Sequence, residues 1–184
     1  MIGVLLAGGA GRRLGGAKPL RELAGRTIAE YPADALKAVC ARVAVVAKPD
    51  SELPEIDGVD RWSEPAQPRH PLTGIVAALE RAGEPVLVCA ADMPFVTADA
   101  LRELIDNTRP PATVATSSGR LQPVLAVYTP EALPQLRASE PNAPLTRTVE
   151  SLNPTTIELP EEITRSVDTP EQLEEAERRI GFPR

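Results

Sequence analysis

Short apolar runs alternate with stretches of helical periodicity along most of this chain, and this alternation restricts its fold more than any other feature. The apolar runs cover residues 2–6, 43–46, 85–89, 113–115 and 124–128, and we interpret them as buried strands. Between them, residues 29–41, 72–82 and 98–107 carry apolar side chains three and four positions apart, as core-facing helices do. The alternation predicts an α/β fold with a Rossmann-like, doubly wound and mostly parallel sheet. A last helix is expected after Thr169 and Pro170.

Length and composition narrow the classes of protein and partner. A chain of 184 residues can form one sizeable core, so residues 1–184 are predicted to be a single domain. The net charge of -6 argues against a nucleic-acid partner, which would need clustered Lys and Arg. Cys40 and Cys89 form no CxxC pair, which fits a reducing cytoplasm better than a disulfide framework or a zinc site. The opening apolar run is too short to span a membrane, so no membrane association or targeting segment is expected.

The first predicted strand leads into a glycine-rich segment suited to holding a polyphosphate. From Leu6 to Lys18 the chain has five glycines, and Arg12 and Arg13 lie among them. Glycines let backbone N–H groups approach phosphates closely, and the cations add positive charge where a triphosphate is most negative. The segment lacks the Gly-Lys-Ser/Thr ending of a Walker A loop and the third glycine of the dinucleotide fingerprint. A different kind of phosphate cradle is therefore predicted, the alternative being a flexible turn with solvated arginines.

A carboxylate just beyond the 85–89 strand is the second feature. Asp92 lies in the segment Ala91-Asp92-Met93-Pro94, and ligands of open parallel sheets bind beyond the carboxyl ends of the strands. Mg2+ takes one or two carboxylates together with substrate phosphate oxygens, so Asp92 is a candidate metal ligand. The alternative is a helix cap, although Thr97 is able to cap the next helix.

Together these segments resemble the molybdenum cofactor guanylyltransferases, a branch of the nucleotidyltransferases of Rossmann-like fold. The likeness spans nearly the whole chain and rests on five segments: Leu6 to Lys18, His70-Pro71-Leu72-Thr73-Gly74-Ile75, Ala91-Asp92-Met93-Pro94, Gln122 to Tyr128, and Val167-Asp168-Thr169-Pro170-Glu171. The resemblance implies a Mg2+-dependent transfer of GMP from GTP to the terminal phosphate of a molybdopterin, with release of pyrophosphate. Other molybdenum cofactor assembly proteins and apo-molybdoenzymes are further candidate partners.

The resemblance also implies which residues hold the nucleotide. Glu64 stands where such enzymes tend to have an acidic residue before the Pro-Leu-x-Gly segment, with a less defined role. With the cations of the cradle, the predicted nucleotide site consists of Leu6, Ala7, Gly8, Gly9, Arg12, Arg13, Lys18, Glu64 and Asp92.

Metal binding and catalysis are expected to involve fewer residues. Asp168 would join Asp92 at the metal, as a late acidic residue does in the wider group, or would cap the last helix with Thr169. Because the acceptor phosphate is already ionised, positioning and charge neutralisation should suffice without a strong general base. The candidate catalytic residues are Lys18, which would draw the phosphates together, Arg13, which shares with Arg12 the candidate role of stabilising pyrophosphate, and Asp92.

Two positions depart from the family pattern. Ala17 replaces an Asp that usually precedes the lysine, which weakens the inference of guanine preference. His70, the only histidine, replaces a glycine before the Pro-Leu pair, and a lone loop histidine is more often a surface or packing residue than a catalyst. On the acceptor side, the run from Gln122 to Tyr128 is expected to line the site or simply to pack as a strand.

Several other functions remain open from the sequence. The same chemistry could serve a cytidylyltransferase for the same pterin, a phospholactate-type guanylyltransferase or a sugar-1-phosphate nucleotidylyltransferase. Gly8-Gly9 favours guanine over cytosine, because cytidine-using pterin enzymes tend to have Ala-Gly there. A catalytically silent nucleotide-binding partner is a further alternative, supported by Ala17. A plain NAD-binding module fails on glycine spacing and on the lack of an acidic ribose partner.

Overall fold

A seven-stranded sheet forms the centre of the protein, seen in a computed structural model that describes residues 1–8, 20–140 and 142–181. Its strand order is β5-β4-β1-β6-β8-β7-β9, and β2 and β3 pair separately as a small antiparallel hairpin. The strands are β1 (Ile2–Leu6), β2 (Glu22–Leu23), β3 (Arg26–Thr27), β4 (Val43–Ala47), β5 (Val59–Ser63), β6 (Val86–Ala90), β7 (Ala112–Ser117), β8 (Arg120–Tyr128) and β9 (Thr155–Glu158).

All strands of the large sheet except β8 run in the same direction. The pairs β5–β4, β4–β1, β1–β6 and β7–β9 are parallel, whereas β8 is antiparallel to both of its neighbours. The carboxyl ends of the parallel strands therefore meet at one edge, and the beginning of β8 lies at that same edge. The ladder between β7 and β8 shifts register between Val114 and Ala115, which leaves a bulge around Pro123 to Leu125 in β8.

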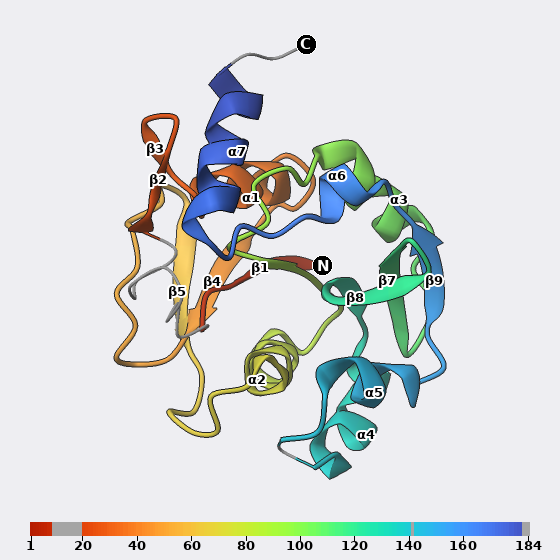
Figure 1. Ribbon diagram of the computed structural model, residues 1–184. Coiled ribbons are helices and arrows are strands. Elements are labelled where there is room, and N and C mark those ends of the chain that lie inside the picture. The colour runs from red at the N-terminus through yellow and green to blue at the C-terminus, as the bar shows by residue number, and fades with distance from the viewer. Residues whose placement is uncertain (9–19, 141, 182–184) are drawn as a thin grey trace.

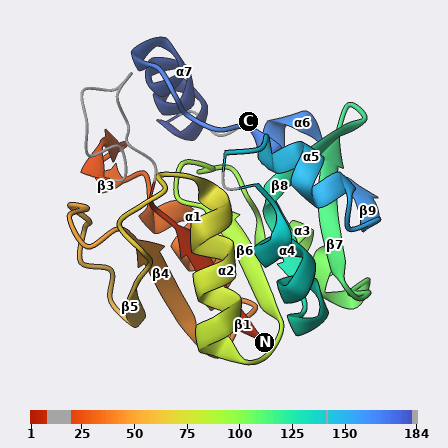
Figure 2. The same cartoon turned by 90° about the horizontal axis from the view of Figure 1, so that it is seen from below.

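Helices cover both faces of the sheet (Figures 1 and 2). One face packs on α1 (Glu30–Lys37) and α3 (Ala98–Asp106), and the other packs on α2 (Pro71–Ala82), α4 (Leu133–Ala138) and α5 (Leu145–Glu150). Along β1, Leu5 points into the first core and Val4 into the second, because successive side chains of a strand face opposite sides. A third small cluster joins α7 (Pro170–Gly181) to the β2–β3 hairpin through Leu23, Ile28 and Ala176.

The predicted doubly wound, mostly parallel sheet is confirmed, but several elements were missed. The edge strands β5 and β9 are largely exposed, and in β5 only Trp62 is buried, so neither has an apolar run. The short elements η3 (Pro130–Ala132), α4, α5 and α6 (Glu161–Thr164) lie in a proline-interrupted region without clear periodicity. Among the described residues, no helix is both long and apolar enough to cross a bilayer.

Candidate active site

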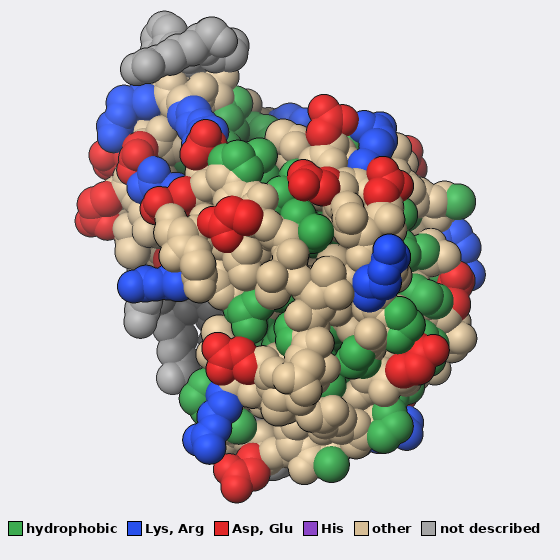
Figure 3. All heavy atoms as spheres, turned by 90° about the vertical axis from the view of Figure 1, so that its right-hand side faces the viewer, with side chains coloured by type: hydrophobic (Ala, Val, Ile, Leu, Met, Phe, Trp, Pro, Cys, Tyr) green, Lys and Arg blue, Asp and Glu red, His purple; other side chains and the backbone are tan. Residues whose placement is uncertain are grey.

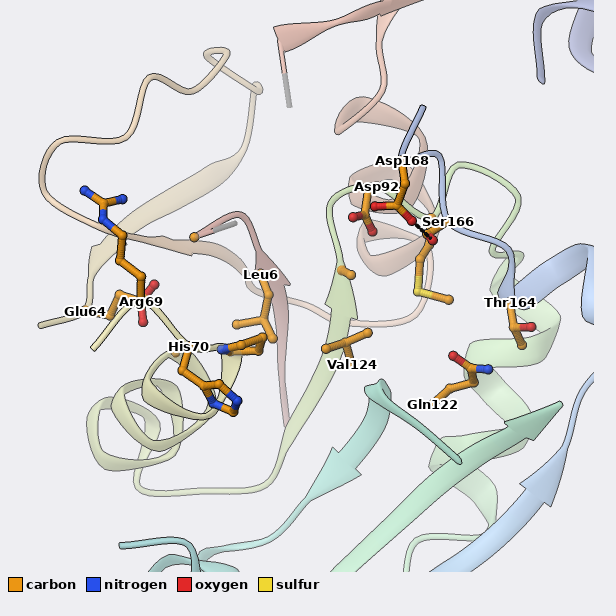
Figure 4. A pocket seen from close by; sticks show the side chains of 15 residues that line it. Leu6, Glu64, Arg69, His70, Asp92, Gln122, Val124, Thr164, Ser166 and Asp168 are labelled. Carbon is orange, nitrogen blue, oxygen red and sulfur yellow. Dashed lines mark hydrogen bonds between the residues drawn. The ribbon is translucent and has the colours of Figure 1, made fainter. Parts of the chain in front are cut away.

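A pocket of about 580 Å³ opens at the edge of the sheet where the carboxyl ends of the parallel strands meet (Figure 4). Side chains that the sequence scatters over more than 160 positions are brought together around it. The lining residues are Leu6, Gly8, Glu64, Arg69, His70, Pro71, Gly74, Ala90, Asp92, Met93, Gln122, Val124, Thr164, Ser166 and Asp168.

The strand directions explain how these residues meet. Leu6 ends β1, Glu64 directly follows β5, and Asp92 lies two residues after β6. Gln122 and Val124 reach the same edge because β8 runs in the opposite direction and so presents its first residues there. Open parallel sheets bind ligands at this edge, so the location agrees with the prediction made for Asp92.

Asp92 and Asp168 lie side by side on one wall of the pocket (Figure 4). A backbone hydrogen bond of 2.8 Å, donated by the Val167 N–H to the Asp92 carbonyl, ties the chain before α7 to the end of β6. Asp168 accepts a hydrogen bond of 2.5 Å from the Ser166 hydroxyl. Two carboxyl groups from opposite ends of the chain are thus placed at one site.

Neither aspartate provides the side-chain cap of the helix that follows it. Thr97 caps α3 by accepting from the Ala100 N–H at 3.3 Å. At α7, Thr169 accepts from the Gln172 N–H at 3.3 Å, and Gln172 Oε1 accepts from the Thr169 N–H at 3.1 Å, which forms a capping box. The capping hydrogen bonds considered as the alternative role of these two carboxylates are therefore made by Thr97 and Thr169.

The Asp92 and Asp168 pair has the donor chemistry that a hard divalent cation requires. Mg2+ is bound by one or two carboxylates and completes its shell with waters and substrate phosphate oxygens, so a pair suffices. Within the described residues, no group of three or more His, Cys, Asp and Glu side chains could form a closed all-protein cage. The pair fits a metal that is shared between protein and substrate.

Glu64 forms part of the opposite wall and is tightly enclosed. Its carboxylate packs between the backbones of Gly8 and Gly74. A Cβ added to Gly8 would lie less than 3.0 Å from Glu64 Oε1, which is closer than real Cβ atoms come to other atoms. Behind it, Lys48 Nζ lies 3.2 Å from Glu64 Oε2, and the two side chains are only 1% and 4% exposed. Burial raises the pKa of Glu64 above its ordinary value, and the Lys48 ammonium opposes that rise.

His70 is the N-cap of α2 and lines the pocket between Arg69 and Pro71. Its Nδ1 accepts a hydrogen bond of 3.2 Å from the Leu72 N–H, which requires a lone pair on Nδ1. The neutral ring must then carry its proton on Nε2. Burial, and secondarily the charge of Lys48, lower the pKa of His70 and favour this neutral form.

Replacing His70 with alanine should destabilise the fold by about 1 kcal/mol near pH 7.5, the usual cost of losing an N-cap. Because the pKa of His70 is lowered in the folded state, its contribution is present above the unfolded pKa and is lost as pH falls through the folded value. Urea unfolding of His70→Ala and of His70→Asn, which keeps a capping acceptor, would measure the effect. Equal stabilities of His70→Ala and wild type at pH 7.5 would contradict it.

The structure brings together five of the predicted site residues at the pocket: Leu6, Gly8, Glu64, Asp92 and Asp168. Ala7 is buried on the side of the core that packs on α1 and does not line the pocket. Its N–H donates a hydrogen bond to the Val46 carbonyl of β4. Four residues predicted to contact the nucleotide lie outside the described residues, namely Gly9, Arg12, Arg13 and Lys18. Ala17, which departs from the family pattern, also lies outside them.

Tyr128 does not line the pocket, contrary to the suggestion for the acceptor side. Since β8 is antiparallel, Tyr128 pairs with Val86, at the end of β6 remote from Ala90. The side chain is fully buried and donates its hydroxyl to the Pro123 carbonyl at 2.7 Å. Sequence reasoning also missed Arg69, Thr164 and Ser166. Arg69 and Ser166 lie in irregular segments, and Thr164 ends the four-residue helix α6, so no periodic pattern marks them.

Comparison with known proteins places this arrangement in a family. Residues 3–155 match the family model of the MobA-like NTP transferase domain. The chain belongs to the MobA-like NTP transferase family. A molybdenum cofactor guanylyltransferase from Rhodopseudomonas palustris is 35% identical over 142 residues, covering 68% of this chain and 65% of the relative. A probable molybdenum cofactor guanylyltransferase from Methanocaldococcus jannaschii is 27% identical over 200 residues, covering 94% and 96%.

Solved structures share the fold of this MobA-like NTP transferase. Molybdopterin-guanine dinucleotide biosynthesis protein A from Archaeoglobus fulgidus superposes with a TM-score of 0.77 at 22% identity, covering 98% of this chain and 99% of that one. A 2-C-methyl-D-erythritol 4-phosphate cytidylyltransferase from Thermus thermophilus gives a TM-score of 0.72 at 20% identity, covering 97% and 98%. The α/β nucleotidyltransferase fold is therefore common to proteins named for different bases and acceptors.

Proposed function

We propose that this MobA-like NTP transferase transfers GMP from GTP to the phosphate of molybdopterin in the presence of Mg2+. The observation that carries the proposal is the Asp92 and Asp168 pair at the carboxyl edge of the sheet, on one wall of the pocket. The relatives named molybdenum cofactor guanylyltransferase support the choice of base and acceptor.

The reaction exchanges one phosphoanhydride bond for another. An oxygen of the acceptor phosphate attacks the α-phosphorus of GTP, a new P–O bond forms, and the bond to the β-phosphate bridging oxygen breaks so that pyrophosphate leaves. Asp92 and Asp168 would hold the metal, whose chemistry is to neutralise negative charge on the phosphates. The acceptor phosphate is an anion at neutral pH, so no residue of the chain has to remove a proton from it.

Positioning is the main task left to the protein. Gly8 has no side chain, which leaves room for the Glu64 carboxylate beside its backbone. The nucleotide is proposed to bind next to Gly8. Arg12, Arg13 and Lys18, which are outside the described residues, are proposed to bind the phosphates. Gln122, Thr164 and Ser166 line the wall near Asp168 and are available to the acceptor.

Base selection can be tested directly. We expect Mg2+-dependent binding of GTP to exceed that of CTP and ATP, and pyrophosphate release to require molybdopterin. Calorimetric titration with each nucleotide and a coupled pyrophosphate assay would measure these two properties. CTP selectivity would instead favour a cytidylyltransferase, a reaction named for the fold neighbour from Thermus thermophilus. GTP binding without release with any phosphorylated acceptor would favour a silent nucleotide-binding protein.

A further inference from the structure

Lys48 is a buried cation at the end of β4 that does not itself line the pocket. Its ammonium donates hydrogen bonds of 2.7 Å to both the Pro65 and the Pro68 carbonyls. At 3.2 Å it also forms an ion pair with Glu64 Oε2. A lysine ammonium has three N–H donors. The two carbonyls accept from two of them, and the Glu64 carboxylate lies within ion-pair distance of the ammonium.

Such burial requires a strong reason, because removing an ammonium and a carboxylate from water costs several kcal/mol per ion and is often not recovered by their attraction. Hydrophobic residues of similar volume would frequently serve stability equally well. The ion pair also lacks the geometry of a well-aligned hydrogen bond. Glu64 Oε2 is buried and, within the described residues, has no hydrogen bond of good geometry, despite its proximity to Lys48.

The two carbonyls that Lys48 holds belong to the segment between β5 and α2. This segment carries Glu64, Arg69 and His70, three of the polar residues that line the pocket. Lys48 thus connects the sheet to the loop that forms one whole wall, while its charge lies directly behind the Glu64 carboxylate. Removing Lys48 would therefore affect this wall in two ways, through loss of the hydrogen bonds to the two carbonyls and through loss of the positive charge beside Glu64.

We propose that Lys48 is a positioning residue, which holds the Glu64 carboxylate as an anion beside Gly8 so that it can accept a hydrogen bond from the bound nucleotide. The inference rests on the proposed nucleotide-binding function of this pocket. Lys48 faces Glu64 Oε2, whereas Oε1 lies beside Gly8, so with Lys48 intact Oε1 is the acceptor for an N–H donor of the nucleotide. Without the ammonium, burial favours the neutral carboxylic acid, and the acceptor is weakened.

Among the residues that the structure describes, few charged or titratable groups face Glu64. Lys48 approaches from the end of β4, Arg69 acts from the loop, and His70 caps α2 nearby, while Gly8 and Gly74 present only backbone. Burial raises the pKa of Glu64, and Lys48 is the largest influence that lowers it. Removing Lys48 should raise the pKa further, so that Glu64 becomes an anion only at higher pH.

The test is the pH dependence of GTP binding, in the presence of Mg2+, by Lys48→Met. The measured quantity is the ratio of the variant's Kd to that of the wild type at each pH from 6.5 to 9, because titration of the nucleotide then cancels. We expect weaker binding by the variant at pH 6.5, with the ratio falling by up to about tenfold per pH unit until Glu64 ionises. Lys37→Met is the matched control, since that lysine is exposed on α1, and its ratio should stay near one.

Two further variants separate charge from structure. Lys48→Gln keeps a donor for the carbonyls without the charge, and it should show the same pH-dependent ratio even if Lys48→Met does not fold. The neutral pair Lys48→Met with Glu64→Gln should regain thermal stability but not GTP affinity. A ratio independent of pH in both single variants, or wild-type affinity in the double variant, would overturn the proposal.

Failure of the proposed function would look different. GTP binding needs no molybdopterin, so a protein that binds GTP with the expected pH behaviour but releases no pyrophosphate refutes the transfer reaction and leaves the role of Lys48 intact. A wild-type protein that binds none of GTP, CTP and ATP would overturn both.

Discussion

Replacing Asp92 with asparagine should lower the rate of pyrophosphate release by on the order of a thousandfold while leaving the fold unchanged. The substitution keeps the shape of the side chain and removes its negative charge, which is the property a divalent cation needs. The backbone carbonyl of residue 92 would still accept from the Val167 N–H, so the chain before α7 should stay in place. Steady-state turnover at saturating GTP and Mg2+, with circular dichroism of the same samples, would measure both effects.

A control variant and a variant of the second proposed ligand test this expectation. Asp99→Asn removes a carboxylate that is 93% exposed on α3 and should leave turnover at the wild-type level. Asp168→Asn should reduce turnover and raise the Mg2+ concentration required for half of it, because one of two proposed ligands remains. Full activity of Asp92→Asn at saturating Mg2+ would refute the metal assignment.

Replacing Gly8 with alanine should have the second large effect, on both folding and nucleotide binding. A Cβ at this position would overlap Glu64 Oε1, which cannot retreat freely because Gly74 and Lys48 lie on its other sides. Overpacking of this kind typically costs about 1–3 kcal/mol, and displacing the carboxylate would also disturb the ion pair. We expect a reduced free energy of unfolding and GTP affinity lowered by at least about tenfold, equivalent to 1.4 kcal/mol.

A double-variant cycle would identify the cause. Glu64→Ala removes the overlapping carboxylate, so adding Gly8→Ala to it should cost much less stability than adding Gly8→Ala to the wild type. Gly181→Ala is the matched control, since no atom lies within 4 Å of a Cβ built there. Additive losses in the cycle would show that the overlap with Glu64 is not the source of the effect.

Much of the framework and part of the site could be predicted from local patterns. The strands at residues 2–6, 43–46 and 85–89 are apolar throughout because both of their faces are covered, and such runs are visible in a sequence. Because parallel strands end at the same edge of a sheet, these runs predict that Leu6, Gly8 and Asp92 approach one another. Edge strands such as β5 could not be recognised, because exposure removes the apolar pattern that marks a strand.

The remaining features depend on contacts between distant segments. No local pattern shows that β8 runs against its neighbours, which brings Gln122 to the pocket and takes Tyr128 away from it. Nor does any pattern reveal that Lys48, an ordinary polar residue in the sequence, is buried behind Glu64. The sequence by itself determined the periodicity of the main elements and the residue types at their ends, since these depend on neighbouring side chains. Only the tertiary structure decided that Asp168 lies beside Asp92 and that Thr169 rather than Asp168 caps α7, because hydrogen bonds and burial arise from the way the folded chain packs.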